Sequence, residues 1–277
     1  MHSVRMIDQW PVEHAATAVV SDGGEVIGSH GDLGRTYALA SVTKLLTAYA
    51  TLVAVEEGAI GLDDPAGPPG STVRHLLAHA SGLDVTARRA RLAPGTRRIY
   101  SNAGFEVLAE TVAQRSGIAF AAYVREGVLD PLGMHATTFD GSPAAGARSS
   151  VADLVRFAAE LQRPVLLDPG TIAQATRVAF PGLPGVLPGF GRHKPNDWGL
   201  GFEIRDAKQP HWTGATSSPR TFGHFGQSGT FLWVDPDAAV ACVTLTDRGF
   251  GQWAAQHWPR YTDAVLAEVR GGGIAPA

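Results

Sequence analysis

Strand-like segments lie near both ends of this chain, and helix-like segments fill its middle. Apolar runs that alternate or end at turns predict strands at residues 15–20, 25–28, 198–205, 221–224, 229–235 and 239–246. Helical spacing of apolar residues predicts helices at residues 73–80, 103–115, 120–128, 151–162 and 252–269. The late strands are expected to form an antiparallel meander. Residues 181–195 are rich in Gly and Pro, so we expect no regular structure there, only a lid or a connector.

This order of segments predicts an α+β fold of the α/β sandwich type, in which an antiparallel sheet is flanked by helices and built from both termini. Residues 1–62 and 196–277 are expected to form the sheet domain. Residues 63–195 are expected to form an inserted helical domain. A ligand would then bind at the seam between the two.

Composition narrows the possible partners. The chain of 277 residues is 44% hydrophobic and 18% charged, as in globular proteins with a sizeable core. Its net charge of −3 gives no electrostatic reason to expect nucleic acid or an anionic membrane, so a small-molecule substrate is expected. Cys242 is the single cysteine, which rules out an internal disulfide.

Targeting signals are not evident in the sequence. Residues 1–11 lack the apolar core of a signal peptide, and the apolar run at residues 45–55 is too short to span a bilayer. We therefore expect a cytoplasmic protein without membrane insertion.

A serine and a lysine stand three residues apart at the head of the most apolar segment, in the sequence Ser41-Val-Thr-Lys44. Residues 42–57 keep helical spacing until Gly58, so a buried helix is expected to begin at Ser41. Side chains three residues apart share one helix face, which places the amine beside the hydroxyl. A lysine with a lowered pKa can take the serine proton, so the pair predicts an acylating serine enzyme.

Two further segments offer the groups that such a serine needs. Tyr100 precedes a predicted helix and can pass a proton once a nearby cation lowers its pKa, while Asn102 can accept from Lys44 and donate to a substrate carbonyl. On a predicted strand, His224 supplies a polar side chain and Gly226 lets a substrate backbone approach.

The oxyanion of the reaction would need two aligned donors. The N–H of Ser41, at a helix N-terminus, and the N–H of Gln227 could both point at it.

The ordered set Ser41-x-x-Lys44, Tyr100-x-Asn102 and His224-x-Gly226 resembles the serine β-lactamase and penicillin-binding protein superfamily. It is most similar to the class C-like branch, which includes family VIII carboxylesterases and D-aminopeptidases. The resemblance extends to the segment at residues 76–83 and to Trp-Gly-Leu-Gly at residues 198–201. It implies that Ser41 is the nucleophile, Lys44 its activator and Tyr100 the general base and acid, and that no cofactor is needed.

The third motif departs from the penicillin-recognising members, which usually have Lys-Thr-Gly where this chain has His224-Phe225-Gly226. A neutral histidine and a phenylalanine would weaken a contact to a substrate carboxylate by roughly 1.5–3 kcal/mol. We therefore predict a carboxylesterase for small esters with uncharged acyl groups. A D-aminopeptidase, a weak β-lactamase or DD-peptidase, and a catalytically silent sensor module remain alternatives.

Other polar residues have competing interpretations. His75 and His79 have the spacing of a zinc helix, but Leu76 replaces the required Glu, so structural roles are favoured and no metal is expected. His224 and Ser228 could form a rival catalytic pair. The arginines before Tyr100 could recruit an anion, although a solvated basic face is favoured; they are Arg88, Arg89, Arg91, Arg97 and Arg98.

Overall fold

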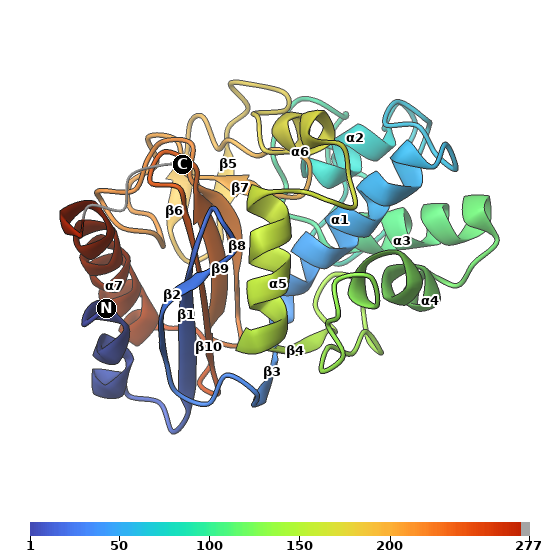
Figure 1. Cartoon of the computed structure of the whole chain (residues 1–277). Helices are drawn as coiled ribbons and strands as arrows, with labels where there is room; N and C mark the ends of the chain where they lie inside the picture. The colour runs from blue at the N-terminus through green and yellow to red at the C-terminus, as the bar shows by residue number, and fades with distance from the viewer. Residues whose placement is uncertain (273–277) are drawn as a thin grey trace.

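A six-stranded antiparallel sheet forms the centre of the molecule in the computed structural model, which describes residues 1–272 (Figure 1). The strands lie in the order β2-β1-β10-β9-β8-β7. Their bounds are Ala15–Ser21 (β1), Val26–His30 (β2), Glu203–Ile204 (β7), Phe222–Gly226 (β8), Thr230–Asp235 (β9) and Val240–Thr246 (β10). The predicted α+β fold with an antiparallel sheet from both ends of the chain is confirmed.

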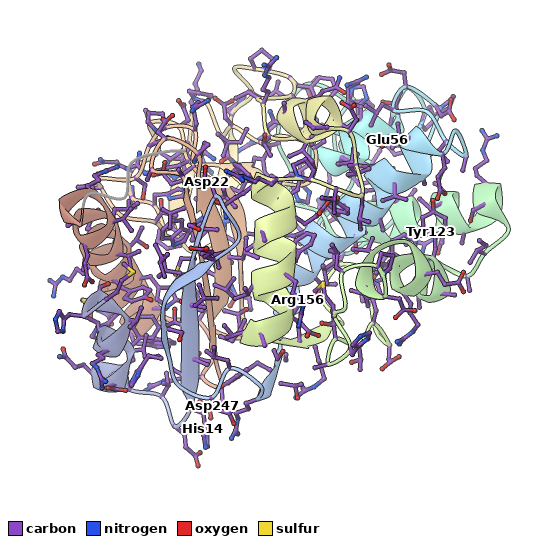
Figure 2. All side chains as sticks on the ribbon, viewed as in Figure 1. His14, Asp22, Glu56, Tyr123, Arg156 and Asp247 are labelled. Carbon is purple, nitrogen blue, oxygen red and sulfur yellow. The ribbon has the colours of Figure 1, made fainter. Side chains whose placement is uncertain are left out.

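The pairing of β1 with β10 joins the two ends of the chain at the middle of the sheet. Its register runs from Ala15 opposite Thr246 to Ser21 opposite Val240. Just beyond the strands, His14 Nδ1 lies 2.7 Å from Asp247 Oδ2, and the two side chains meet at one edge of the molecule (Figure 2).

Helices cover both faces of the sheet, which explains why its central strands are buried on both sides. On one face, Val19 and Trp233 pack in a core with α7 (Gln252–Gly271) and the 3-10 helix η1 (Ser3–Gln9). On the other face, Ala18 and Leu232 pack in a second core with α1 (Thr43–Glu56) and α5 (Val151–Gln162). Because side chains alternate along a strand, neighbouring residues enter different cores.

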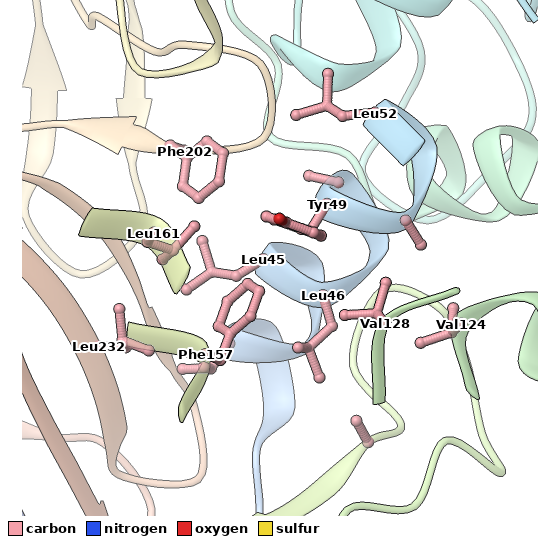
Figure 3. Close-up of a cluster of buried hydrophobic side chains, with 14 of the residues drawn as sticks. Leu45, Leu46, Tyr49, Leu52, Val124, Val128, Phe157, Leu161, Phe202 and Leu232 are labelled. Atoms are coloured by element: carbon pink, nitrogen blue, oxygen red, sulfur yellow. The ribbon is translucent and has the colours of Figure 1, made fainter. Parts of the chain in front are cut away.

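Helix α1 is buried almost throughout its length. Leu45 and Tyr49 face Phe157 of α5, while Leu46 faces Val128 from the helical segment after α4 (Figure 3). The Tyr49 and Phe157 rings meet edge to face at 5.4 Å. A helix that is apolar on all sides has to lie between layers, and α1 lies between the sheet side and the helical side of the molecule.

In the sequence, the remaining elements come from residues 36–42, directly before α1, and from the segment between α1 and β7. They are η2 (Ala40–Val42), α2 (Val73–Leu77), α3 (Asn102–Ser116), α4 (Phe120–Val124), a π-helical turn η3 (Arg125–Leu129), α6 (Pro169–Ala175), and the two-stranded pairs β3 (Thr36–Ala38) with β4 (Arg148–Ser150) and β5 (Gly185–Leu187) with β6 (Gly191–His193).

The structure corrects two expectations. Residues 181–195 are not irregular throughout, because Gly185 pairs with His193 and Leu187 with Gly191 in the β5–β6 hairpin. Residues 198–205 contribute a strand of two residues, β7, instead of a long one.

The division into a sheet domain and an inserted helical domain stays a prediction. Helix α5 belongs to the range 63–195, yet it contacts β1 and β10 of the sheet. The end of the range 196–277 lies outside the described residues. Within residues 1–272, no helix is both long and apolar enough to cross a membrane.

Candidate active site

Ser41 lies in the short η2 turn that leads into α1, at the seam between the sheet and the helices. The residue before it, Ala40, has a left-handed φ of 45°, a conformation that costs a non-glycine residue roughly 1–2 kcal/mol. Ser41 stays partly exposed, whereas α1 behind it is buried. The turn therefore presents the hydroxyl at the N-terminal end of a rigid helix.

Lys44 is fully buried beside Ser41, as the spacing predicts. Its Nζ lies 3.4 Å from Ser41 Oγ and donates to Asn102 Oδ1 at 2.7 Å and to the Ala144 carbonyl at 2.8 Å. Burial lowers the pKa of Lys44 to about 7. A neutral amine has two N–H groups and one lone pair. The two shorter bonds use both N–H groups, which leaves the lone pair for the Ser41 hydroxyl.

Tyr100 is the second neighbour of the serine. Its hydroxyl donates to Ser41 Oγ at 2.7 Å and lies 3.4 Å from His224 Nε2. Burial raises the pKa of Tyr100, and this outweighs the opposing effect of the hydrogen bond to Ser41. The expected lowering of this pKa by a cation is therefore wrong, because burial disfavours the charged phenolate and is the largest influence on this group.

His224 is buried on β8 and faces Tyr100. Its Nδ1 lies 2.7 Å from the Phe225 carbonyl, which can only accept, so Nδ1 carries the proton and Nε2 the lone pair. Burial and the nearby Lys44 lower the pKa of His224 to about 3. The side chain is thus uncharged at neutral pH. Phe225 points into the core instead, with its ring 5.0 Å from that of Phe250.

Asn102 is held at the start of α3 by its neighbours. The Ser101 hydroxyl accepts from the Gly104 N–H at 3.0 Å and so caps the helix. The Ser101 N–H donates to His79 Nδ1 at 3.1 Å. His79 therefore supports the loop that carries Tyr100 and Asn102, a structural role of the kind expected for it.

Gly226 ends β8 next to the turn that carries Ser41. A Cβ on this residue would lie 2.3 Å from the Leu39 carbonyl oxygen. The glycine is thus needed by the protein's own backbone, and not only by an approaching substrate as the sequence suggested. Gln227 follows directly and lines the same cavity as Ser41.

A cavity of about 40 Å³ opens beside Ser41, Tyr100, His224 and Gln227. The rest of its wall consists of Leu187, Pro188, Trp198, Glu203, Trp212 and Phe225. The sequence motifs contained Trp198 and Phe225, but sequence reasoning did not identify the other four as wall residues. Leu187 and Pro188 come from the β5–β6 hairpin region, so the segment proposed as a lid or connector forms part of the cavity.

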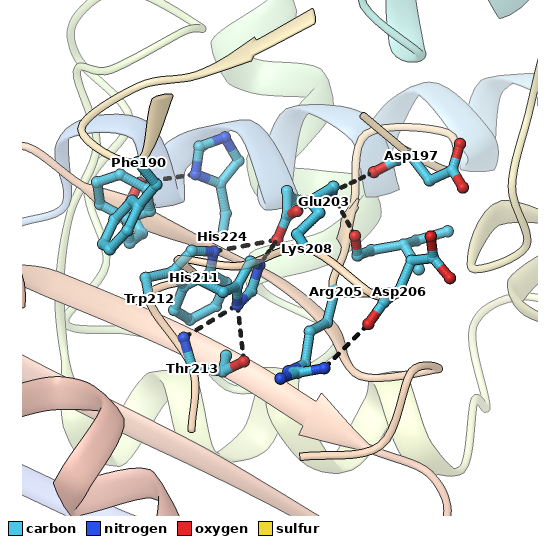
Figure 4. Close-up of polar contacts among 12 residues, drawn as sticks. Phe190, Asp197, Glu203, Arg205, Asp206, Lys208, His211, Trp212, Thr213 and His224 are labelled. Atoms are coloured by element: carbon cyan, nitrogen blue, oxygen red, sulfur yellow. Dashed lines mark hydrogen bonds and ion pairs between the residues drawn. The ribbon is translucent and has the colours of Figure 1, made fainter. Parts of the chain in front are cut away.

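A buried ionic cluster includes Glu203 and Trp212, two residues that line the cavity (Figure 4). Glu203 pairs with Lys208 through Oε1, and its Oε2 accepts from His211 Nε2 at 2.9 Å and from Trp212 Nε1 at 3.0 Å. Burial alone would raise the pKa of Glu203, but His211 and Lys208 together hold it well below its usual value. The carboxylate is therefore fully partnered inside the protein.

Three alternative interpretations of the sequence can be compared with the contacts. Ser228 Oγ bonds Thr230 Oγ1 at 3.1 Å, so no Ser228–His224 pair is formed. Arg98 is not on a solvated face, because it is buried and donates to backbone carbonyls that include Asn196 and Ala78. His75 Nδ1 bonds Thr72 Oγ1 at 2.9 Å, which agrees with a structural role.

The sequence model of the Beta-lactamase family matches residues 11–267. The chain belongs to the Beta-lactamase family. This confirms the resemblance to the serine β-lactamase and penicillin-binding protein superfamily.

Individual relatives differ in how much they share with the chain. A crystal structure of a β-lactamase from Mycobacterium bovis is 58% identical, with a TM-score of 0.95 over 96% of this chain and 99% of that one. The hydrolase EstCE1, with promiscuous acyltransferase activity, shares the fold at 20% identity, with a TM-score of 0.77 over 95% of this chain and 96% of that one.

Similarity to curated relatives is partial. The D-alanyl-D-alanine-carboxypeptidase/endopeptidase AmpH of Escherichia coli K12 is 27% identical over 183 residues, which are 49% of this chain and 48% of AmpH. The chain thus matches about half the length of this relative. The family is settled by the match over most of the chain, and the substrate has to be argued from the site.

Proposed function

We propose that the protein is a serine hydrolase that works through an acyl-enzyme on Ser41, and that it is a carboxylesterase for small esters with uncharged acyl groups. One observation carries the substrate class: among residues 1–272, those that line the cavity include neither a lysine nor an arginine. The buried His224 replaces the expected cation and is neutral. A substrate carboxylate would lose its hydration there without gaining a charged partner.

Acylation begins with proton transfer from Ser41 to Lys44. The lone pair of the neutral Lys44 takes the hydroxyl proton while Ser41 Oγ forms a bond to the ester carbonyl carbon. The carbonyl π electrons move onto its oxygen, where the N–H groups of Ser41 and Gln227 are proposed to stabilise the charge. A pKa near 7 keeps a large share of Lys44 in the base form at neutral pH.

Departure of the alcohol needs an acid. Tyr100 is a protonated phenol at 2.7 Å from Ser41 Oγ, close to the position where the leaving oxygen detaches. As the carbon–oxygen bond breaks, the phenol gives its proton to the alkoxide, and the ammonium of Lys44 restores that proton. In the second half, neutral Lys44 takes one proton from water as the water oxygen bonds to the acyl carbon. The bond between that carbon and Ser41 Oγ then breaks, Lys44 returns the proton to Ser41 Oγ directly or through Tyr100, and the carboxylic acid leaves.

The alternatives receive different support. The AmpH relative gives a specific reason to retain a DD-peptidase as the second candidate. A silent sensor module is disfavoured because Ser41 is partly exposed and lines the cavity. The cytoplasmic location stays a prediction.

A substrate panel tests the proposal. The wild type is expected to hydrolyse p-nitrophenyl acetate and butyrate faster than nitrocefin or a D-alanyl-D-alanine peptide. Ser41→Ala, purified in parallel, should lose the ester activity. Faster turnover of nitrocefin or of the peptide would refute the assignment as an esterase, and full ester activity in Ser41→Ala would refute the mechanism.

A further inference from the structure

We infer that Trp212 is a specificity-determining residue that limits the cavity to acyl groups of about two to four carbons, and that the buried Glu203 cluster positions it. This inference rests on the proposed hydrolase function and adds the length of the acyl chain. The indole is almost completely buried, with 1% of its surface exposed, yet it lines the cavity that opens on Ser41.

The size of the cavity sets the limit on chain length. A volume of about 40 Å³ accommodates roughly three water-sized groups. An acetyl, propionyl or butyryl chain fits such a space, whereas an octanoyl chain would have to displace the wall. The wall beyond the catalytic residues is apolar or aromatic, apart from Glu203, whose oxygens are engaged with its own partners.

The cavity suits the acyl part of an ester better than the alcohol part. The alcohol has to diffuse away before water attacks the acyl-enzyme, so it needs an open path. The acyl group remains bonded to Ser41 until water attacks, and the apolar wall of the cavity can hold it in place during that time. Tyr100, the proposed acid, lines the same cavity and hydrogen-bonds Ser41 Oγ.

Trp212 is fixed in its place from two sides. Its Nε1–H donates to Glu203 Oε2, and its ring packs 5.9 Å from Phe225 and 6.2 Å from Phe231. Glu203 is itself fixed by Lys208 and by His211. The tautomer of His211 is set because its Nδ1 accepts from the Thr213 N–H at 3.1 Å, which leaves Nε2–H to donate to Glu203. This arrangement prevents the indole from swinging aside for a longer chain.

The test measures kcat/KM for p-nitrophenyl acetate, butyrate and octanoate in the wild type, Trp212→Leu and Trp212→Phe. Trp212→Leu is expected to raise the octanoate-to-butyrate ratio at least tenfold. Trp212→Phe, which keeps the aromatic packing and loses the N–H and one ring, should raise it about threefold and covers the case in which the leucine variant fails to fold. The matched control is Trp10→Leu, which removes a buried indole of the same core away from the cavity and should leave the ratio unchanged.

A second series separates the two ends of the ester. Ethyl and hexyl acetate should respond equally to Trp212→Leu if the cavity holds the acyl group. A selective gain on hexyl acetate, or an unchanged octanoate-to-butyrate ratio in folded variants, overturns the inference while the hydrolase function stands. If Ser41→Ala hydrolyses esters as fast as the wild type, both the inference and the proposed hydrolase function are overturned.

Discussion

Lys44 is the residue at which burial determines the chemistry of the site. An exposed lysine holds its proton at neutral pH and cannot act as a base. Desolvation lowers the pKa of Lys44 to about 7, and the bonds to Asn102 and Ala144 direct its lone pair toward Ser41. A lysine at the same helix position on the surface of the protein could not serve as the proposed base.

The pH dependence of hydrolysis follows from this pKa. Below pH 7 the lysine is protonated and cannot accept the serine proton, so kcat/KM for p-nitrophenyl acetate should fall about tenfold per pH unit. Above pH 7 it should reach a plateau. Steady-state rates between pH 5 and 9 in buffers of constant ionic strength measure the profile. A flat profile across pH 6 to 8 would contradict the role of Lys44 as the base.

How far the sequence predicts individual site residues depends on whether they sit in local motifs. Ser41 lies in the η2 turn directly before α1 and Lys44 in the first turn of α1, so their spacing of three residues alone brings them together. Tyr100 and His224 could be placed near them only through the ordered motifs of a family. Trp212 gave no such signal, because its position in the cavity depends on the fold of a long loop before β8.

At the scale of elements, the turn before α1 and the end of β8 are built against each other. Thr230 Oγ1 donates to the Leu39 carbonyl at 3.0 Å, and Gly226 leaves no room for a Cβ beside the same carbonyl. The contact of the Leu39 carbonyl with Gly226 and Thr230 therefore sets the distance between Ser41 and Gln227, and with it the proposed oxyanion site. We call this contact the Leu39–β8 seam.

A methyl group at the Leu39–β8 seam should disturb both stability and rate. Gly226→Ala is expected to lower the free energy of unfolding by about 1–3 kcal/mol through overpacking and to reduce ester hydrolysis more than tenfold. Urea unfolding and kcat/KM measure the two effects. Gly127→Ala is the control, because its Cβ would lie 3.7 Å from Val53 in ordinary contact within a helical segment. Wild-type activity in Gly226→Ala would show that the Leu39–β8 seam does not set the site.

The Glu203 cluster should contribute strongly to the free energy of unfolding, but only while all of its charged partners are present. Lys208→Met leaves the buried Glu203 carboxylate without its ammonium partner. Removal of one partner of a buried pair costs about 3–5 kcal/mol. Arg220→Ala breaks the exposed pair with Asp237 and should cost less than about 1 kcal/mol. Thermal unfolding of both variants compares them. An equal, small shift in Tm would contradict a structural role of the cluster.

The β5–β6 hairpin shows why elements rich in Gly and Pro are hard to predict. Local propensity marks residues 181–195 as irregular, and no alternation of apolar residues reveals strands of three residues. The hairpin instead depends on tertiary contacts, such as the Phe190 ring at 5.7 Å from that of Phe225. Long segments such as α1 and α7 were predicted to within a few residues, because their apolar residues repeat with helical spacing over many positions.

At the scale of the whole molecule, one hydrophobic core joins the sheet to the helices. Leu45 and Phe105, from α1 and α3, belong to the same buried cluster as Ala18 and Val243 of the sheet. The site depends on this continuity, since Ser41 and Tyr100 lie on the helical side and His224 lies on the sheet.

A shared core predicts that the chain unfolds in one step. Near-ultraviolet circular dichroism and tryptophan fluorescence in urea should show coincident midpoints, although helices from the range 63–195 interrupt the sheet. The tryptophans report mainly on the core beside α7. If the helical layer unfolded separately, the midpoint from far-ultraviolet dichroism would therefore differ from the midpoint of tryptophan fluorescence. Two separated transitions would favour an independent helical domain.

The central claim is that Ser41 is acylated because Lys44 and Tyr100 activate it. Peptide mass spectrometry after reaction with an organophosphonate ester measures this directly. The folded wild type should carry one adduct on Ser41. Lys44→Met should react at least a hundredfold more slowly, and urea-unfolded protein should not be labelled there. An adduct on another residue, or no adduct on Ser41 in the folded protein, would contradict the account.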